Sequence, residues 1–346
     1  MSTLFVGDLH AKSDLLPLIG MAAIRERADR IVLLGDICDD WNVSNNGLIR
    51  FFETFTSWYR REAGEREVVP LLGNHDVPYF LKQGSSSYAR ARAVAPGFKP
   101  GAHRRVHELM QNIPFQLAWS DGNILATHAG LTRMWGRRRL GVDYMDMPVE
   151  EVADRLNRML LHPASLAVPM TDIGPARGGA GVPSPLWCDR GEFAGDGDTC
   201  LTQVVGHTPV PTVLNEHDAW FCDTFSTASD GTPLGDGSML LHGDDGSFRT
   251  IPLYGADGPG RGGTAPRRGS ESGFPHQGRR KPSRFFTDTG KKPVVCIGMR
   301  VVCITRRIPS IPRKPLETKG YGKIRIKVCI VCIYFPSYSL LPLLPL

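Results

Sequence analysis

Residues 30–39 read RIVLLGDICD, a short apolar run that ends abruptly in glycine and acidic residues. A run of β-prone residues before such a polar break predicts a buried strand that leads into a loop. The same pattern recurs in TLFVGDLH (3–10), EVVPLLGNHD (67–76), NILATHAG (123–130) and TQVVGHTP (202–209). The chain therefore has five candidate strands, each with polar side chains at its end.

Stretches with helical spacing separate these strands. Residues 13–29 place apolar side chains on one face behind Ser13 as an N-cap, and residues 103–112 and 149–161 are similar. Strands that alternate with helices indicate an α/β fold built in layers around a core. Three later runs without helices between them predict an antiparallel closing set: AWFCDT (219–224), SMLLHGD (238–244) and FRTIPLY (248–254).

The charge of the chain is unevenly distributed. Residues 261–346 contain 18 Lys+Arg against 3 Asp+Glu, which leaves 23 against 32 in residues 1–260. The formal net charge of +6 is therefore set by the tail, while the part that reads as folded is acidic. An acidic folded part gives no reason to expect specific nucleic-acid binding.

Composition divides the chain into three segments. Residues 1–254 read as a folded domain, residues 255–292 as a Gly/Pro/Arg-rich linker, and residues 293–346 as a basic, proline-interrupted apolar tail of unknown role. Prolines and serines inside the last apolar run argue against a membrane anchor. The sequence MSTLFVGDLH leaves no room for a signal peptide, so we expect a cytoplasmic protein with reduced thiols.

The polar residues at the strand ends suit a metal site. In α/β sheets ligands bind beyond the carboxyl ends of the strands, so loops that are distant in sequence can converge there. Carboxylates, imidazoles and a carboxamide are ligands for divalent transition metals that accept mixed nitrogen and oxygen shells. Two ions can be held if one carboxylate bridges them. The six candidate ligands are Asp8, His10, Asp36, Asn74, His128 and His207.

These residues resemble the motifs of the calcineurin-like metallophosphoesterases. The motifs stand in the family's order as Asp8-Leu9-His10, Gly35-Asp36-Ile37-Cys38-Asp39, Gly73-Asn74-His75-Asp76, Thr127-His128-Ala129-Gly130 and Gly206-His207-Thr208-Pro209. The resemblance covers about residues 3–254 and implies a four-layer αββα sandwich, with a disordered or poorly structured C-terminal extension beyond it. The last motif, with Gly-His-Thr, resembles the branch of phosphoprotein phosphatases and symmetrical diadenosine tetraphosphatases.

The resemblance also implies a division of roles. Asp8 and His10 would hold the first ion, Asp36 would bridge, and Asn74, His128 and His207 would complete the second. Two divalent ions are implied, Mn²⁺ first, with Fe, Zn²⁺ or Ni²⁺ as alternatives. A bridging hydroxide would attack the phosphoester while His75, oriented by Asp39, protonates the leaving oxygen.

One departure from the family leaves the substrate open. Protein phosphatases of this branch have Arg-Gly where this chain has Asp40-Trp41, and an acidic Asp40 would repel phosphate. A phosphate-binding arginine must then come from elsewhere. The candidates are Arg133, Arg137, Arg177 and Arg190.

Two loops have alternative readings. The stretch GPARGGAG (174–181) lacks the Lys-Ser/Thr of a phosphate-binding P-loop, and we interpret it as a flexible active-site loop. The run RMWGRRR (133–139) either binds phosphates or acidic partners, or forms a solvated basic surface.

Several functions fit the motifs. The first is a phosphomonoesterase or serine/threonine-type protein phosphatase, and the second is a nucleotide hydrolase resembling diadenosine tetraphosphatase. The expected partners are therefore a phosphorylated small molecule, a nucleotide or a phosphoprotein. A non-catalytic scaffold is less consistent with the complete ligand set, and a nuclease with the acidic folded part.

Overall fold

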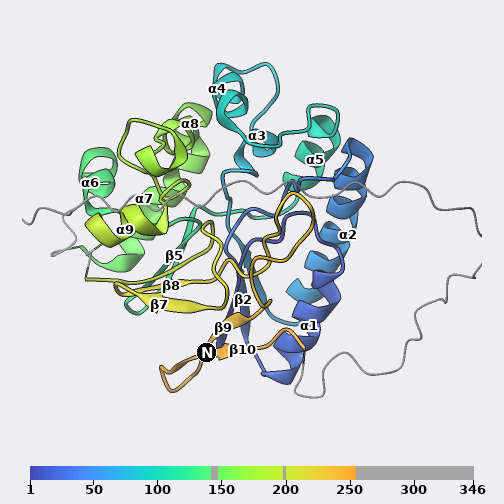
Figure 1. Ribbon diagram of the computed structural model, residues 1–346, viewed down its shortest axis with the longest axis vertical. Helices are drawn as coiled ribbons and strands as arrows, with labels where there is room; N and C mark the ends of the chain where they lie inside the picture. The colour runs from blue at the N-terminus through green and yellow to red at the C-terminus, as the bar shows by residue number, and fades with distance from the viewer. Residues whose placement is uncertain (142–146, 198–199, 255–346) are drawn as a thin grey trace, which may run out of the picture. The chain divides into compact units, whose positions relative to one another are not determined.

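The computed structural model describes residues 1–141, 147–197 and 200–254. At its centre lie two five-stranded sheets with helices around them (Figure 1), which confirms the predicted α/β class. The predicted linker (255–292) and tail (293–346) lie outside the described residues, so the three-part division of the chain stays a prediction. Among the described residues, no helix combines the length and apolar character needed to cross a bilayer.

The strands of each sheet are not in chain order. The first sheet runs β10 (Phe248–Ile251), β9 (Met239–His242), β1 (Thr3–Val6), β2 (Arg30–Leu33) and β3 (Glu67–Pro70). The second runs β4 (Ala118–Asp121), β5 (Ile124–Thr127), β6 (Thr202–Val205), β8 (Ala219–Phe221) and β7 (Leu214–Glu216).

Parallel pairing brings the polar strand ends together. In the first sheet β1 pairs with β2 and β2 with β3, with Leu4 beside Ile31 and Ile31 beside Val68. In the second sheet β5 pairs with β6 and β6 with β8, again in parallel. The loops that follow β1, β2 and β3 therefore leave the first sheet at one edge, and those after β5 and β6 leave the second sheet in the same way.

The predicted antiparallel closing set is wrong in one part. β9 and β10 do form an antiparallel pair at the edge of the first sheet. β8 instead belongs to the second sheet, where it lies parallel to β6. The short strand β7, absent from the predicted elements, pairs antiparallel with β8, so the chain reverses within the second sheet before it crosses to the first.

The two sheets pack face to face. Alternate residues of the first sheet, Phe5, Val32 and Val69, join Trp119 and Val204 of the second in one buried apolar cluster. Because side chains alternate across a strand, the neighbours of these residues point to the opposite face of each sheet, where the helices lie. The layers are thus helix, sheet, sheet and helix, as the αββα expectation requires.

Helices cover both outer faces. The α-helices are α1 (Leu15–Arg25), α2 (Asn45–Ala63), α3 (Val77–Phe80), α4 (Ser86–Val94), α5 (His103–Met110), α6 (Arg133–Trp135), α7 (Val149–Arg158), α8 (Pro163–Thr171) and α9 (Arg190–Asp196). A π-helix spans Gly136–Leu140, and 3₁₀ turns span Met159–Leu161 and Pro175–Arg177.

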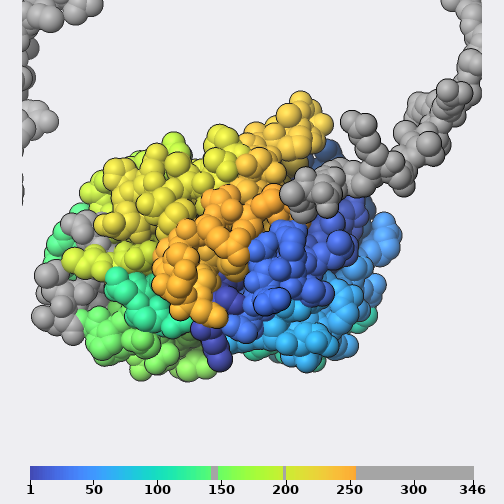
Figure 2. Space-filling view, turned by 90° about the horizontal axis from the view of Figure 1, so that it is seen from below, coloured from blue at the N-terminus to red at the C-terminus, as the bar shows by residue number. Residues whose placement is uncertain are grey.

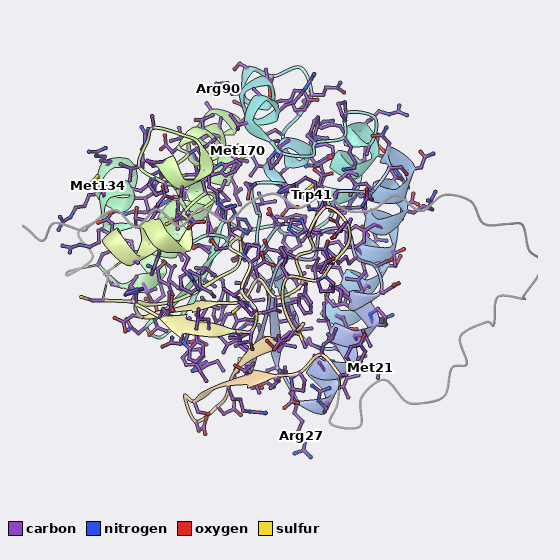
Figure 3. The ribbon with its side chains drawn as sticks, in the orientation of Figure 1. Met21, Arg27, Trp41, Arg90, Met134 and Met170 are labelled. Carbon is purple, nitrogen blue, oxygen red and sulfur yellow. The ribbon has the colours of Figure 1, made fainter. Side chains whose placement is uncertain are left out.

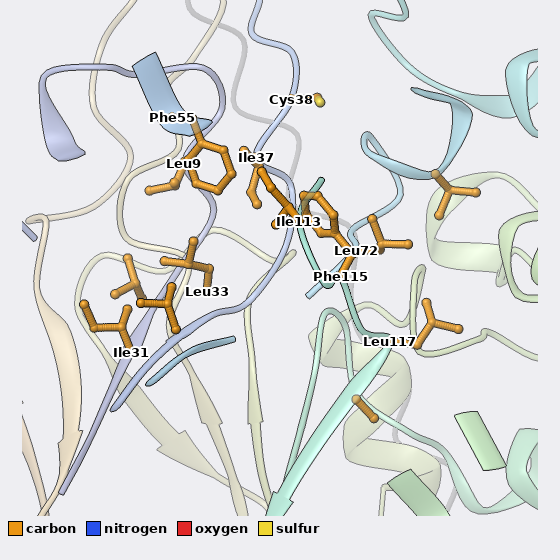
Figure 4. Close-up of a cluster of buried hydrophobic side chains, with 14 of the residues drawn as sticks. Leu9, Ile31, Leu33, Ile37, Cys38, Phe55, Leu72, Ile113, Phe115 and Leu117 are labelled. Atoms are coloured by element: carbon orange, nitrogen blue, oxygen red, sulfur yellow. The ribbon is translucent and has the colours of Figure 1, made fainter. Parts of the chain in front are cut away.

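Helix α2 is the longest helix in the described part of the chain. Its buried Leu48, Phe51, Phe52 and Phe55 recur at helical spacing, and the Ser44 hydroxyl accepts a hydrogen bond from the Gly47 amide at 3.0 Å. Figure 4 shows Phe55 beside Leu9 and Ile37, residues of the loops that follow β1 and β2. Packing of α2 therefore supports the backbone on which the candidate site residues sit.

The start of α1 differs from the prediction. The helix begins at Leu15 with Asp14 in the N-cap position, and no side chain caps it, so Ser13 is not the N-cap. The first turn is held instead by backbone bonds of the preceding turn, from the Leu16 amide to the Ser13 carbonyl. At the other end, Arg25 donates to the Pro252 carbonyl at 2.8 Å. Figure 2, which views the molecule from below Figure 1, shows the last described strands beside the N-terminal segment.

Candidate active site

Loops after four parallel strands and the turn after β3 place the candidate side chains together. One set of possible metal ligands consists of Asp36, His128 and His207. Each residue offers one ligand atom, and these three atoms all lie within 4.8 Å of one another. A second set, with the same spacing, contains His10, Asp36 and His75. Asp36 belongs to both sets, which is the position that a bridging ligand would take.

Backbone strain accompanies this arrangement. His10, Asp36, Asp39 and His207 all have positive φ angles, of 44°, 47°, 62° and 65°. Non-glycine residues seldom adopt such angles, and where they do so they cluster at functional sites. All four lie in the loops that follow β1, β2 and β6.

Two glycines allow close packing around the acidic residues. A β-carbon at Gly73 would collide with the Asp36 side chain and backbone, and one at Gly206 would collide with a carboxylate oxygen of Asp8. The His207 amide in turn donates to both oxygens of Asp8, at 3.0 and 3.1 Å. The glycines of the Gly-Asn-His and Gly-His motifs therefore make room for the carboxylates rather than binding a ligand themselves.

Hydrogen bonds to carbonyl groups fix two of the imidazoles. His128 donates from Nδ1 to the Leu34 carbonyl at 2.8 Å, and His10 donates from Nδ1 to the Asp39 carbonyl at 2.9 Å. Because a carbonyl can only accept, Nδ1 carries the proton and Nε2 is left with a lone pair in the neutral ring. This is the arrangement that metal-binding histidines use to orient the ring.

The lone pair of His128 faces other acceptors. Its Nε2 lies 3.0 Å from Oδ1 of Asn74, 3.1 Å from Nδ1 of His207 and 3.4 Å from Oδ2 of Asp36. Nε2 of His207 is buried and has no hydrogen-bond partner. A buried group of acceptors fits a cation, since a bound ion would satisfy them together, and His207 can offer it one ring nitrogen.

Asp8 lies slightly apart from the two sets. Its Oδ2 is 3.9 Å from Nε2 of His10, and the residue is fully buried. Burial, together with the charges of Asp223 and Asp36, raises the pKa of Asp8 well above its ordinary value. Three carboxylates buried close together are costly in the absence of positive charge, which again fits a cationic ligand.

His75 and Asp39, the predicted proton-transfer pair, face each other. Nδ1 of His75 lies 3.9 Å from Oδ2 of Asp39, and neither atom has a hydrogen-bond partner. Burial lowers the pKa of His75, but the charges of Asp36 and Asp39 more than offset it, and the pKa is raised. A shift of about 1 Å would close the pair into a hydrogen bond of ordinary length.

Two residues that the sequence motifs did not indicate hold Asp39. The Tyr79 hydroxyl donates to Oδ1 of Asp39 at 2.8 Å, and Nζ of Lys99 lies 3.4 Å from the same oxygen. Tyr79 also accepts a hydrogen bond from the Lys99 amide at 2.8 Å. These contacts occupy Oδ1 and leave Oδ2 toward His75. No spacing rule would have found them, because both lie on segments without a strand-end motif.

Asp76, next to His75, holds two loops of the site together. Its carboxylate accepts from the amides of Ile37 (3.2 Å), Cys38 (2.8 Å) and Gly73 (2.9 Å). It therefore ties the loop after β2 to the loop after β3, and these loops carry Asp36 and Asn74.

The site opens into a cavity of about 480 Å³. Of the four candidate arginines, Arg177 is the one that lines this cavity among the described residues. Its guanidinium lies 3.1 Å from Asp189 and donates to the Thr208 hydroxyl at 3.4 Å. Arg133 begins α6 and Arg137 lies in the π-helix, while Arg190 begins α9, 3.8 Å from Glu216.

Asp40 also lines the cavity, but its charge is offset. Nζ of Lys12 lies 3.1 Å from Oδ2 of Asp40. The repulsion of phosphate expected from Asp40 is therefore weaker than the sequence alone predicts. Lys99 supplies a further positive charge on the wall of the same cavity.

Comparison with protein families agrees with this geometry. The family model described as calcineurin-like phosphoesterase matches residues 1–223, which include every residue of the two ligand sets. The chain belongs to this family. The two ligand sets provide candidate positions for the metals of this family.

Individual proteins share only low sequence identity with the chain. The chain is similar to a symmetrical bis(5'-nucleosyl)-tetraphosphatase of Aliivibrio fischeri, 28% identical over 137 residues, or 39% of this chain and 47% of the relative. The chain thus spans about half the length of that relative. The structure is similar to that of a cold-active protein tyrosine phosphatase, with a TM-score of 0.42 and 18% identity. The match covers 72% of this chain and 80% of the phosphatase chain. A dimetal phosphatase from Danio rerio has a TM-score of 0.31 at 13% identity, covering 73% and 99%.

Proposed function

We propose that this calcineurin-like phosphoesterase hydrolyses phosphomonoesters at a centre of two divalent ions. The observation that supports it most strongly is the pair of ligand sets that share Asp36. Asp8 and His10 would hold one ion, Asn74, His128 and His207 the other, and Asp36 both. When bound, two such ions make water acidic enough to attack near neutral pH and offset charge on the phosphoryl oxygens.

The protein side chains would perform the remaining tasks. Arg177 projects from the loop 174–181 and would bind a phosphoryl oxygen, since guanidinium groups match phosphate geometry. His75 would protonate the leaving oxygen, because its raised pKa keeps a proton available and Asp39 lies beside it. His75 also belongs to one ligand set, so its role as a proton donor instead of a ligand is part of the proposal.

A second candidate is hydrolysis of a nucleotide. The similarity to the Aliivibrio fischeri tetraphosphatase supports it, and so does the cavity of about 480 Å³, a volume typical of small-molecule sites. A preference for Mn²⁺ rests on the mixed nitrogen and oxygen ligands alone, and a cytoplasmic location rests on the sequence alone.

The full chain loaded with Mn²⁺ can be assayed on four substrates: para-nitrophenyl phosphate, a phosphopeptide, diadenosine tetraphosphate and single-stranded DNA. We expect turnover of para-nitrophenyl phosphate. Faster turnover of diadenosine tetraphosphate would favour the nucleotide alternative, and faster turnover of the phosphopeptide would favour a protein phosphatase. Absence of turnover on every substrate, in protein shown to contain metal, would contradict the proposal.

A further inference from the structure

Trp41 lines the cavity, yet the hydrolytic chemistry gives it no task. The residue is 69% exposed and shares the cavity wall with Asp36, His75 and Arg177. The other five tryptophans of the chain are buried or half-buried. Figure 3 shows Trp41 beyond the carboxyl ends of the strands, on the opposite side of the fold from Arg27. A tryptophan exposed in the wall of a polar site offers a planar aromatic face to whatever enters the cavity.

The Trp41 ring is held in one orientation. Its indole Nε1 donates to the Thr227 carbonyl at 3.0 Å, and its backbone amide donates to the Asp40 carboxylate at 2.7 Å. The adjacent Asn42 donates to the Ser229 carbonyl at 3.2 Å. The loop after β2 is therefore fastened to the segment between β8 and β9. An aromatic ring fixed before binding loses little conformational entropy when a ligand stacks on it.

Apolar side chains line the same cavity as Trp41. Leu234, which is 44% exposed, lines the same cavity, as do Pro96 and Pro209. Asp40 beside the ring is neutralised by Lys12 at 3.1 Å. Leu234 lies close to the anchor of Trp41, because its amide donates to the Ser226 carbonyl at 2.9 Å, next to Thr227, whose carbonyl accepts from the Trp41 ring. The cavity lining therefore combines the ligand sets and Arg177, which suit a phosphate group, with Trp41 and Leu234, which suit a planar apolar group.

We propose that Trp41 and Leu234 form a subsite that binds a planar aromatic ring carried by the phosphorylated substrate. The inference rests on the proposed hydrolytic function, because the ring would enter attached to the phosphate. Stacking on tryptophan is tolerant of ring type, since every aromatic ring offers a π-face. The ring could belong to a nucleobase or to a simple aryl phosphate, and the two differ in their distance from the phosphate.

Steady-state kinetics separates these sources. The Mn²⁺-loaded full chain is assayed as wild type, Trp41→Leu and Trp41→Phe on ATP, phenyl phosphate and glycerol 2-phosphate. We expect Trp41→Leu to raise KM about tenfold for an aromatic substrate and less than about twofold for glycerol 2-phosphate, with Trp41→Phe intermediate. A rise for ATP alone indicates a nucleobase, and a rise for phenyl phosphate indicates an aryl ring near the phosphate. No rise, or an equal rise for all three substrates, overturns the proposal.

Asn42→Ala is the matched control for the loop. It removes the neighbouring contact to Ser229 and keeps the Trp41 ring, so KM should stay within about twofold of wild type for every substrate. If Asn42→Ala raised KM as much as Trp41→Leu, loop position rather than the ring would be responsible, and the proposal would fail.

Fluorescence gives a readout that does not need turnover. We expect AMP to quench tryptophan emission of the wild type and ribose 5-phosphate, which has no aromatic ring, to leave it unchanged. Trp41→Leu should abolish the quenching by AMP. Quenching that persists in Trp41→Leu overturns the subsite. If the wild type hydrolyses no substrate but AMP still quenches Trp41, the proposed hydrolysis fails while the subsite stands.

Discussion

Nε2 of His128 and Nδ1 of His207 lie 3.1 Å apart in the buried part of the site. The other nitrogen of His128 donates to the Leu34 carbonyl, so a neutral His128 directs a lone pair at its neighbour. Oδ2 of Asp36, a further acceptor, lies 3.4 Å from the same atom. Acceptors this close require either a proton or a cation between them, so protonation and metal binding compete at this contact.

Binding of Mn²⁺ should therefore release a proton from His128. Burial lowers the pKa of His128, but the charge of Asp36 and its hydrogen bonds raise it above the ordinary value of 6.5. The metal-free imidazole thus stays protonated above pH 6.5, and affinity for Mn²⁺ should rise with pH, by up to about tenfold per unit below the folded pKa. Titration calorimetry at pH 6 and pH 8, in buffers of different ionisation enthalpy, measures both affinity and proton release. Equal affinity at the two pH values would contradict this account.

Stability should depend on metal most strongly above pH 6. Burial raises the pKa of Asp223 to about 6 and that of Asp8 well above its ordinary value. A raised folded pKa means that the folded state binds more protons than the unfolded state between about pH 4 and 6. The contribution of these two carboxyl groups to the stability of the metal-free protein is therefore fully present below about pH 4 and is lost as pH rises through about 6.

Bound cations should offset this loss, so the Tm difference between Mn²⁺-loaded and chelator-treated protein should be larger at pH 7.5 than at pH 5. Differential scanning fluorimetry measures it. Asp223→Asn is the control, because it removes the charge and keeps an oxygen for the Ser226 hydroxyl. It should raise the Tm of the metal-free protein at pH 7.5. A Tm difference that is the same at both pH values would rule out the buried carboxylates as its cause.

The positions of the candidate ligands could be predicted because they follow from topology. Asp36 ends a strand whose apolar residues are contiguous in sequence, and parallel pairing of β1, β2 and β3 brings such ends to one edge. The two ligand sets contain one residue from each of the five predicted strand ends, with His75 in place of Asn74 at the third. Five motifs in a fixed order were enough to indicate the family.

Other parts could not be predicted from local sequence. Arg177 reaches the cavity because Asp189 and Thr208, from separate segments, hold its guanidinium. Tyr79 supports Asp39 across 40 residues of chain. The pairing of Asp40 with Lys12 depends on how two loops meet, so the sequence overstated the effect of Asp40 on phosphate. Helix α2 does have helical spacing, but Asn45, Asn46 and Gly47 at its start read as a turn.

Replacement of His75 and of Asp36 should separate proton transfer from metal binding. His75→Ala should keep both metals and lose turnover by a factor of about 10² to 10⁴, the usual contribution of a general acid. Asp36→Ala should lose metal as well, because Asp36 belongs to both ligand sets. Metal content by mass spectrometry, measured on the same samples as turnover, tests this. If both variants were fully loaded with metal, the division of roles would be wrong.

Arg177→Ala should weaken substrate binding. Removal of a guanidinium from the cavity wall should raise KM for para-nitrophenyl phosphate about tenfold, equivalent to about 1.4 kcal/mol. Arg133→Ala is the matched control, because Arg133 begins α6 and is not among the described residues that line the cavity. Its KM should match the wild type. A larger effect of Arg133→Ala than of Arg177→Ala would assign phosphate binding to the basic run 133–139.

Tyr79→Phe should impair turnover without loss of metal. The Tyr79 hydroxyl donates to Asp39 and accepts from the Lys99 amide, both at 2.8 Å, so its removal leaves that amide unpaired and frees Asp39 to move away from His75. We expect kcat to fall about tenfold, a modest share of what a general acid contributes. The free energy of unfolding should fall by about 1–3 kcal/mol, the cost of an unsatisfied buried polar group.

Tyr88→Phe is the control for the Tyr79 substitution. Its hydroxyl is buried without a hydrogen-bond partner, and its ring packs against Phe98 and His103, as the Tyr79 ring does. Loss of this hydroxyl breaks no bond, so Tyr88→Phe should keep wild-type kcat and be at least as stable as the wild type in urea. A tenfold loss of kcat in both variants would show that the aromatic cluster as a whole, rather than the Tyr79–Asp39 hydrogen bond, supports His75.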